Sequence, residues 1–357
     1  MELHHIRGRG AAYNPPNRFE RLSYEPDPEW VDPDEPDPWR TTQYFRDSAR
    51  SVLTRNSSPD VPFDVGLNPY RGCSHGCAYC YARPNHEYLG LSAGLDFESK
   101  IFVKMDAPEL LRAELSSSRW KPETIIMSGV TDPYQPAERR FGITRRCLEV
   151  LAEFRNPVAL ITKNHMVTRD IDLLGVLASR GAALVNISIT SLNRELQHVL
   201  EPRTSIPARR LAAVEALASA GVPVNVMIAP VIPGLTDHEI PDILTAAAAA
   251  GARSAGYVPL RLPGAVADIF QRWLQDHFPD RKERVLNRIR EIRGGKLNDS
   301  RFGSRMRGSG VYWEQIGAMF EAVSRRQGLN AERSSLSTAS FRKPHIGGQL
   351  GLFDSEV

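Results

Sequence analysis

Short apolar runs alternate with longer amphipathic stretches through the middle of the chain. Six of these runs are rich in branched aliphatic residues and are bounded by glycine or polar residues, as buried strands are; they cover 65–70, 124–128, 158–162, 183–189, 222–228 and 255–258. Between them, apolar residues recur at helical spacing over 107–117, 144–154, 169–180, 207–220 and 237–250. Strands that alternate with helices form a parallel sheet with right-handed crossovers. About six such units therefore predict an α/β fold with a partial (βα)6 TIM-like barrel.

The two ends of the chain differ from the middle. The first 63 residues hold no sustained periodicity, and 25–39 contain five prolines and seven carboxylates, which predicts an extended acidic arm. Apolar spacing over 270–278, 285–292 and 311–323 predicts small helices that close the open side of the barrel. We therefore expect an extended arm (1–63), a barrel (64–262), a C-terminal helical extension (263–329) and a flexible tail rich in serine, threonine and glycine (330–357).

Composition narrows the class of protein. With 357 residues, 41% hydrophobic and 24% charged, the chain fits one barrel-sized domain with appendages and excludes a wholly disordered or fibrous protein. The longest apolar stretch, near 244–256, is well short of the roughly 20 residues of a membrane span. Because the N-terminus lacks the pattern of a secretory signal, we expect a cytoplasmic protein. The net charge of +3 is too small to identify a partner.

Three of the four cysteines lie within eight residues, directly after the first predicted strand. Cys73, Cys77 and Cys80 form a Cys-x3-Cys-x2-Cys motif whose thiolates can converge on zinc, copper(I) or an iron–sulfur cluster. A closed zinc site uses four protein ligands, whereas three thiolates on a cubane leave one iron open to a substrate or cofactor. The count favours a cluster. One alternative is a zinc loop completed by His75 or His86, which would make the protein a nucleic-acid-binding adaptor, and the other is three ordinary buried thiols.

The fourth cysteine has a different setting. Cys147 lies at helical spacing from Leu151 on an apolar face, which indicates core packing and not metal binding.

The residues around the three cysteines resemble the radical S-adenosylmethionine superfamily, in particular its spore-photolyase-like branch. The resemblance rests on the cysteine spacing, on Tyr79 before the third cysteine, and on the strings at 68–73, 80–83 and 131–138, and it spans about 55–323. It implies a [4Fe-4S] cluster on the three cysteines whose open iron binds S-adenosylmethionine. Reduction by an external donor such as flavodoxin or ferredoxin would then release a 5′-deoxyadenosyl radical at the carboxyl ends of the barrel strands.

The same resemblance implies cofactor-binding residues. Tyr79 is expected to pack near the adenine, and Ser128, Lys163 and Ser188, each at or near a strand end, match positions that contact the cofactor. A lysine at a strand end can pair with the cofactor carboxylate, and the alternative for Lys163 is a solvated surface charge. The alternative for Ser188 is a hydroxyl bonded to backbone.

The string at 131–138 supplies further candidates. Glu138 is expected to accept from the cofactor ammonium or from Arg139, or to face water at a helix start. Asp132 before Pro133 either positions substrate or closes a turn.

One residue departs from the branch. Spore photolyase carries a cysteine beside the matching serine that returns a hydrogen atom to the product, and Met127 stands in that place here. We therefore do not expect thymine-dimer splitting by that route, and Tyr134 is the candidate replacement as hydrogen source.

Two further segments bear on partners. The stretch 281–307 carries ten Lys or Arg and three Asp or Glu, which suits a phosphate backbone, or else a solvated helix face paired with the acidic arm. In the tail, Gln349, Leu350, Leu352 and Phe353 match four of five positions of a peptide that docks on the bacterial DNA sliding clamp. The alternative is an accidental match or an apolar end that packs on its own domain. DNA is the expected substrate, of a repair-like reaction, with RNA, a peptide or a small molecule as alternatives.

Overall fold

A computed structural model describes residues 6–20, 41–332 and 335–344. All six predicted strands form, and they are parallel neighbours in chain order within one sheet. They are β3 (Val65–Leu67), β6 (Ile125–Met127), β7 (Val158–Thr162), β8 (Ala183–Ser188), β9 (Val224–Val231) and β10 (Ser254–Pro259). The antiparallel strand β2 (Leu53–Arg55) extends the edge next to β3, so β2 and β10 are the two edges of an open, barrel-like sheet.

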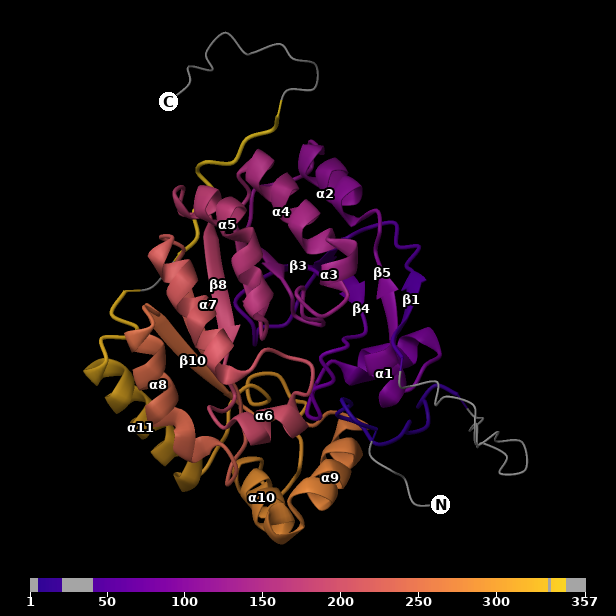
Figure 1. Ribbon diagram of the computed structural model, residues 1–357, viewed down its shortest axis with the longest axis vertical. Helices are drawn as coiled ribbons and strands as arrows, with labels where there is room; N and C mark the ends of the chain where they lie inside the picture. The colour runs from indigo at the N-terminus through magenta and orange to yellow at the C-terminus, as the bar shows by residue number, and fades with distance from the viewer. Residues whose placement is uncertain (1–5, 21–40, 333–334, 345–357) are drawn as a thin grey trace.

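The predicted crossover helices also form. They are α2 (Ala107–Ser116), α4 (Ile143–Phe154), α5 (Ile171–Ala178), α7 (Pro207–Ser219) and α8 (Ile240–Ala249). Short 3-10 turns, η2 (His165–Asp170) and η3 (Asp237–Glu239), precede α5 and α8. The extension forms α9 (Val266–His277), α10 (Pro279–Ile292) and α11 (Val311–Arg326); α9 and α10 lie at the lower end of the molecule and α11 lies beside α8 (Figure 1).

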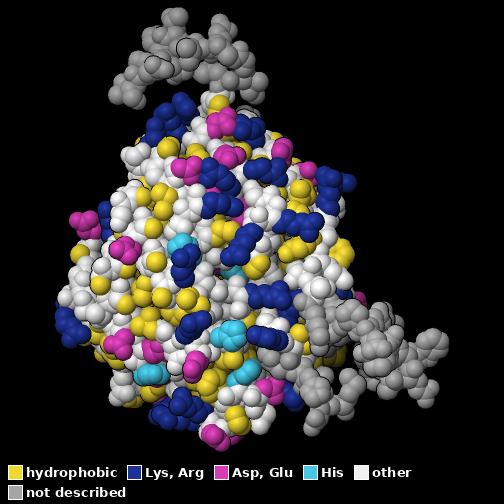
Figure 2. Space-filling model, in the orientation of Figure 1, with side chains coloured by type: hydrophobic (Ala, Val, Ile, Leu, Met, Phe, Trp, Pro, Cys, Tyr) yellow, Lys and Arg dark blue, Asp and Glu magenta, His cyan; other side chains and the backbone are white. Residues whose placement is uncertain are grey.

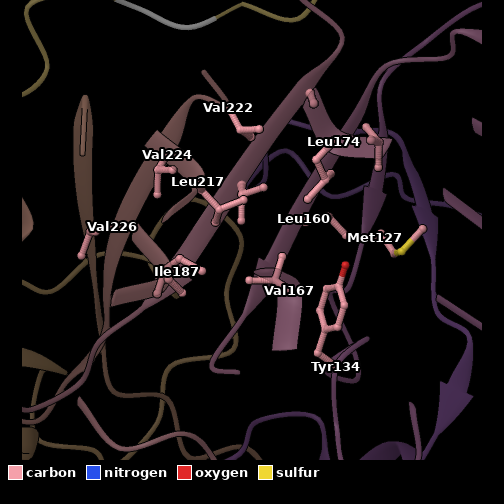
Figure 3. Packing of buried hydrophobic residues seen from close by; sticks show 14 of the residues in the cluster. Met127, Tyr134, Leu160, Val167, Leu174, Ile187, Leu217, Val222, Val224 and Val226 are labelled. Carbon is pink, nitrogen blue, oxygen red and sulfur yellow. The ribbon is translucent and has the colours of Figure 1, made fainter. Parts of the chain in front are cut away.

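The helices bury one face each against the sheet. Figure 3 shows Leu160 and Ile187 of the sheet beside Leu174 and Leu217 of α5 and α7, all fully buried. Burial of such a side chain stabilises the fold by about 1.5–3 kcal/mol relative to its exposure to water. Cys147 lies fully buried on the inner face of α4, which confirms the prediction of core packing for this residue. No helix in the described ranges is long and apolar enough to span a bilayer.

Several short elements were not predicted. A second sheet has the order β1 (Gln43–Arg46), β5 (Lys100–Val103) and β4 (Tyr70–Arg71). The 3-10 turn η1 (Arg83–Leu89) and the short helix α1 (Leu95–Ser99) precede β5. The helix α3 (Glu138–Phe141) precedes α4, and α6 (Arg194–Leu200) follows β8. Strands of two to four residues are too short to show a period of two, which is why the pattern did not reveal them.

The described parts of both chain ends pack on the body. β1 and β2, within the predicted arm, are members of the two sheets; residues 25–39, the acidic part of that arm, lie outside the described residues. The start of the tail was predicted to be flexible, but the amide of Ser337 donates to Gly181 O at 2.9 Å, and the Phe341 ring lies 6.3 Å from that of Phe154. The predicted docking peptide at 349–353 also lies outside the described residues.

Candidate active site

The three clustered cysteines lie on a loop that follows β4, which we call the cysteine loop (residues 72–80). Gly72 enters it with a φ of 74°, and the next amide, that of Cys73, donates to Phe97 O at 2.9 Å. Cys73 and Cys77 are buried and Cys80 is half-buried, all as free thiols. Burial raises the pKa of Cys77 and raises that of Cys80 to about 11, and the nearby Cys73 adds to both shifts. The fold thus brings the three thiols within electrostatic range of one another.

A buried ion pair holds the backbone of the cysteine loop in place. Arg83 is fully buried; it donates to Cys77 O at 2.8 Å and to Gly76 O at 3.3 Å, and pairs with Glu98 at 2.5 Å. A guanidinium with five donors suits this task because it can satisfy several carbonyls at once. The shape of the loop therefore depends on Arg83 and Glu98, neither of which was singled out from the sequence.

A short N-terminal segment, residues 8–11, packs against the same pair; we call it the strap. Glu98 accepts from Gly10 N at 3.0 Å and from Ala11 N at 2.8 Å. Gly10 lies so close to the cysteine loop that a Cβ there would be 1.8 Å from Gly76 O. This part of the predicted arm is therefore buried under the candidate site and does not extend over the surface.

The segment 131–138 contacts the cysteine loop through hydrogen bonds. Gln135 accepts from Ser74 N at 3.0 Å and donates to Gly72 O at 3.0 Å. Asp132 accepts from Tyr134 N at 2.8 Å, which closes a turn, and from Lys163 N at 2.8 Å. Asp132 thus links the loop after β6 to the end of β7.

The two histidines proposed as zinc ligands have other surroundings. His75 Nδ1 lies 3.4 Å from Asp132 and its Nε2 lies 3.3 Å from Asn164 Nδ2; burial opposes the charged ring, but Asp132 raises the pKa of His75 to about 9. The His86 ring packs edge-on against Phe97, and burial lowers its pKa to about 4. Within the described ranges, no three His, Cys, Asp or Glu side chains are arranged to hold a metal ion.

A second polar group lies at the carboxyl ends of the strands, centred on Glu201 just after α6. Its carboxylate lies 3.2 Å from Lys163 Nζ, accepts from Thr190 Oγ1 at 2.8 Å, and also receives Tyr79 Oη and Arg210 Nη2. Burial alone would raise the pKa of Glu201, but Arg210 and Lys163 outweigh it and hold that pKa below its usual range.

Two of the predicted cofactor-binding residues, Tyr79 and Lys163, belong to this polar group. Lys163 is 15% exposed, and its Nζ lies 5.7 Å from the centre of the Tyr79 ring, so it is not a solvated surface charge. Tyr79 and Lys163, predicted as cofactor contacts, are therefore neighbours in space. Glu201 and Arg210, which hold them, were missed by the sequence analysis.

Ser128 and Ser188 lie at the same edge of the sheet. Ser128 follows β6 with an unusual φ of 139°, and its hydroxyl donates to Thr131 O at 3.1 Å. Ser188 is the last residue of β8, and its carbonyl accepts from Arg210 Nη1 at 2.9 Å. Both are buried next to the strand ends where parallel barrels build their sites.

Two other predicted site residues lie elsewhere. Glu138 is fully buried and is bound by Tyr70 Oη at 2.5 Å and by Arg169 Nη2 at 2.7 Å, so it neither faces water nor pairs with Arg139. The Tyr134 hydroxyl donates to Asp170 at 3.0 Å within the hydrophobic core, where Figure 3 shows the ring. Both side chains are thus committed to the packing beneath α4, which argues against contact with cofactor or substrate.

Comparison with proteins of known sequence and structure gives consistent results. The family model described as the Radical SAM superfamily matches residues 67–247, just over half of the chain. An uncharacterized protein of Mycobacterium bovis is 37% identical over 234 residues, 65% of this chain and 68% of that protein. A radical SAM Nα-GlyT isomerase of Pseudomonas phage M6 is 27% identical over 198 residues, 55% of this chain and 39% of that protein.

The fold also has solved neighbours. A mutant of spore photoproduct lyase has a TM-score of 0.55 and 18% identity, with 81% of this chain and 79% of that chain covered. Another of its structures, with bound AdoMet and dinucleoside spore photoproduct, has a TM-score of 0.52 at 17% identity, with 81% of this chain and 79% of that chain covered. At these identities the likeness shows the fold. With the family model and the sequence relatives, it places the chain in the radical S-adenosylmethionine superfamily of enzymes.

Proposed function

We propose that Cys73, Cys77 and Cys80 hold a [4Fe-4S] cluster that binds S-adenosylmethionine and, when an external donor reduces it by one electron, cleaves the cofactor to methionine and a 5′-deoxyadenosyl radical. The observation that carries this proposal is that three free thiols, two buried and one half-buried, lie within electrostatic range of one another on one loop, whose Tyr79 lies beside Lys163. Three thiolates satisfy three irons of a cubane and leave the fourth open. Of the two histidines in the zinc alternative, His75 contacts other side chains through both ring nitrogens, and the His86 ring packs edge-on against Phe97.

The surrounding residues have separate tasks in this proposal. Arg83 and Gln135 hold the carbonyls and amides of the cysteine loop, so the thiols keep their relative positions. Glu201 holds the Lys163 ammonium at the strand ends, where it can attract the carboxylate of the cofactor. The Tyr79 ring, bound through its hydroxyl to Glu201, supplies a flat apolar wall for an adenine.

We also propose a nucleic acid as substrate. Support comes from the fold neighbour that holds a dinucleoside spore photoproduct and from the basic stretch 281–307. Met127, fully buried before Ser128, has no thiol hydrogen to donate, so we do not propose thymine-dimer splitting by the thiol route that the resemblance implies.

The test is anaerobic reconstitution with iron and sulfide, followed by analysis of the protein and of its products. We expect a brown protein with about four irons and four sulfides. With S-adenosylmethionine and dithionite it should form methionine and 5′-deoxyadenosine. A colourless protein with one zinc and no cofactor cleavage would contradict the proposal. Mass spectrometry of damaged DNA, RNA and peptides added to the reaction then identifies the substrate class.

A further inference from the structure

A cation without an acidic partner lies at the rim of the sheet. Arg261 follows the carboxyl end of β10, the edge at which parallel barrels bind their substrates. Its Nη1 donates to Met306 Sδ at 3.2 Å, and its Nε is buried without a hydrogen-bond partner. Among the described residues, no carboxylate forms an ion pair with this guanidinium. A half-buried guanidinium in this state is poised to receive an anion.

Other cations surround Arg261. Arg293 donates to Leu260 O at 2.8 Å, and Arg305 lies nearby, paired with Asp60 at 2.5 Å. Burial and Arg305 lower the pKa of Arg261, and burial and Arg261 lower that of Arg293 to about 10. Since Asp60 is already bound to Arg305, an anion that arrives from solvent relieves the repulsion among these arginines.

Exposed aromatic rings adjoin this cationic site. Tyr81 directly follows Cys80 and is 47% exposed; its hydroxyl donates to Gly129 O at 2.6 Å, and the Arg261 guanidinium lies 5.4 Å from its ring centre. Phe302 is 63% exposed, with the guanidinium of Arg305 4.5 Å from its ring. The Tyr81 hydroxyl is bound to Gly129, and about half of the side chain stays exposed to solvent.

In Figure 2, Lys and Arg side chains lie across the visible face, several of them near its middle, with Asp and Glu mostly above and below them. A flat ring beside an unpaired guanidinium is the combination by which proteins hold single-stranded nucleic acid, with the ring under a base and the cation at the backbone.

We propose that Arg261 and Tyr81 form a nucleotide-binding site, in which the guanidinium takes a backbone phosphate and the ring stacks on the neighbouring base of an unpaired nucleotide. The inference rests on the proposed function, because it assigns the residues that would bind the nucleic acid proposed there as substrate. The position of Tyr81, next to a cluster ligand, brings the stacked base to the candidate active site.

The test is fluorescence anisotropy of the full-length reconstituted protein, without S-adenosylmethionine. The two probes are a labelled single-stranded DNA of about 12 nucleotides and an abasic strand with the same phosphates. We expect Arg261→Met to weaken the binding of both probes about tenfold and to reduce the slope of log affinity against log salt by about one. Tyr81→Leu should weaken binding of the base-bearing probe about tenfold and leave the abasic probe unchanged, whereas Tyr81→Phe, which keeps the ring, should bind as the wild type does.

The matched control is Arg253→Met, at the opposite end of the same strand, where the arginine is exposed. An equal loss in this variant would show that only general charge matters and would overturn the proposal. Unchanged probe binding in Arg261→Met would also overturn the proposal, because the guanidinium would then not bind a nucleic acid. This holds whether or not the variant binds S-adenosylmethionine more weakly. A wild type that forms 5′-deoxyadenosine but binds neither probe would overturn this inference and leave the proposed cofactor cleavage standing. Probe binding without cofactor cleavage would overturn the proposed cofactor cleavage and leave this inference standing.

Discussion

Three buried glutamates each face an arginine, two of them beside the candidate site and the third, Glu138, beneath α4. The pairs are Glu98 with Arg83, Glu201 with Arg210, and Glu138 with Arg169. Loss of one partner from such a pair typically costs about 3–5 kcal/mol, because it leaves a charge buried without compensation. Single residues of this kind therefore control the positions of the thiols and of Lys163 more strongly than the exposed ion pairs do.

The first residue-scale prediction concerns the thiols. We expect Cys73→Ala, Cys77→Ala and Cys80→Ala each to lose the site-differentiated cluster, because each thiol serves one iron. Cys147→Ala, a fully buried cysteine of the core, is the control and should keep its iron. Iron content and the electron paramagnetic resonance spectrum of the reduced protein measure the difference. Equal loss of iron in the control would refute the ligand assignment.

The second prediction concerns Lys163 and its carboxylate. Lys163→Ala should retain the cluster and weaken S-adenosylmethionine binding, because the ammonium at the end of β7 is lost. Glu201→Gln should instead lower the free energy of unfolding by about 3–5 kcal/mol, since Arg210 stays buried without its counter-charge. Calorimetric titration with the cofactor and thermal unfolding separate the two effects. Unchanged cofactor affinity in Lys163→Ala would show that the residue only supports the fold.

At the scale of elements, the cysteine loop is held between segments that are distant in sequence. The strap and α1 lie on one side of it, and the loop after β6 lies on the other. Asn14 and Asp96 also exchange two hydrogen bonds, at 3.2 Å and 2.9 Å, which anchors the chain after the strap to α1. The position of the cysteine loop therefore depends on contacts with both of these chain regions and not on the loop residues alone.

Gly10→Ala tests this dependence. The new Cβ would meet Gly76 O, and forced repacking of this kind costs about 1–3 kcal/mol, so we expect a lower melting temperature and faster loss of iron to a chelator. Gly175→Ala, in α5 with open space around the Cα, is the matched control and should behave as the wild type or better. Iron retention equal to that of the control would show that the strap does not support the cysteine loop.

At the scale of the whole molecule, the described tail crosses the side of the barrel away from the cysteine loop. Arg342 N donates to Phe154 O at 2.9 Å, at the end of α4, and Lys343 Nζ donates to Ser117 O at 2.8 Å, just after α2. The carboxyl end of the described tail thus lies near the amino ends of the strands, at the opposite end of the sheet from the candidate site.

We propose, as a partner, the DNA sliding clamp, bound through Gln349, Leu350, Leu352 and Phe353. Leu352 and Phe353 could each contribute about 1.5–3 kcal/mol on burial, whereas Gly351 adds an ordering cost of about 0.5–1 kcal/mol, so we expect micromolar affinity. The double variant Leu352→Ala, Phe353→Ala should lose clamp binding in calorimetry and keep cofactor cleavage. No binding by the intact protein at high micromolar concentration would refute the prediction.

The six parallel strands, their helices and the family chemistry could be predicted from the sequence by itself, because periodicity and the spacing of Cys73, Cys77 and Cys80 are local properties. The support of the site could not be predicted, because it consists of contacts between residues far apart in the chain. Tyr79 and Glu201 are 122 residues apart, and Gly10 and Glu98 are 88 apart.

The order of residues in a motif does not show in which direction each side chain points. Tyr134 and Glu138 belong to the same string as Gln135, yet they point into the packing beneath α4 while Gln135 contacts the cysteine loop. A linear motif does not specify which face of a turn each side chain takes; the packing of α4 on the sheet does. The sequence thus determined the fold and the thiols, and only the tertiary structure decided which charges and amides hold them, since long-range burial and pairing set those positions.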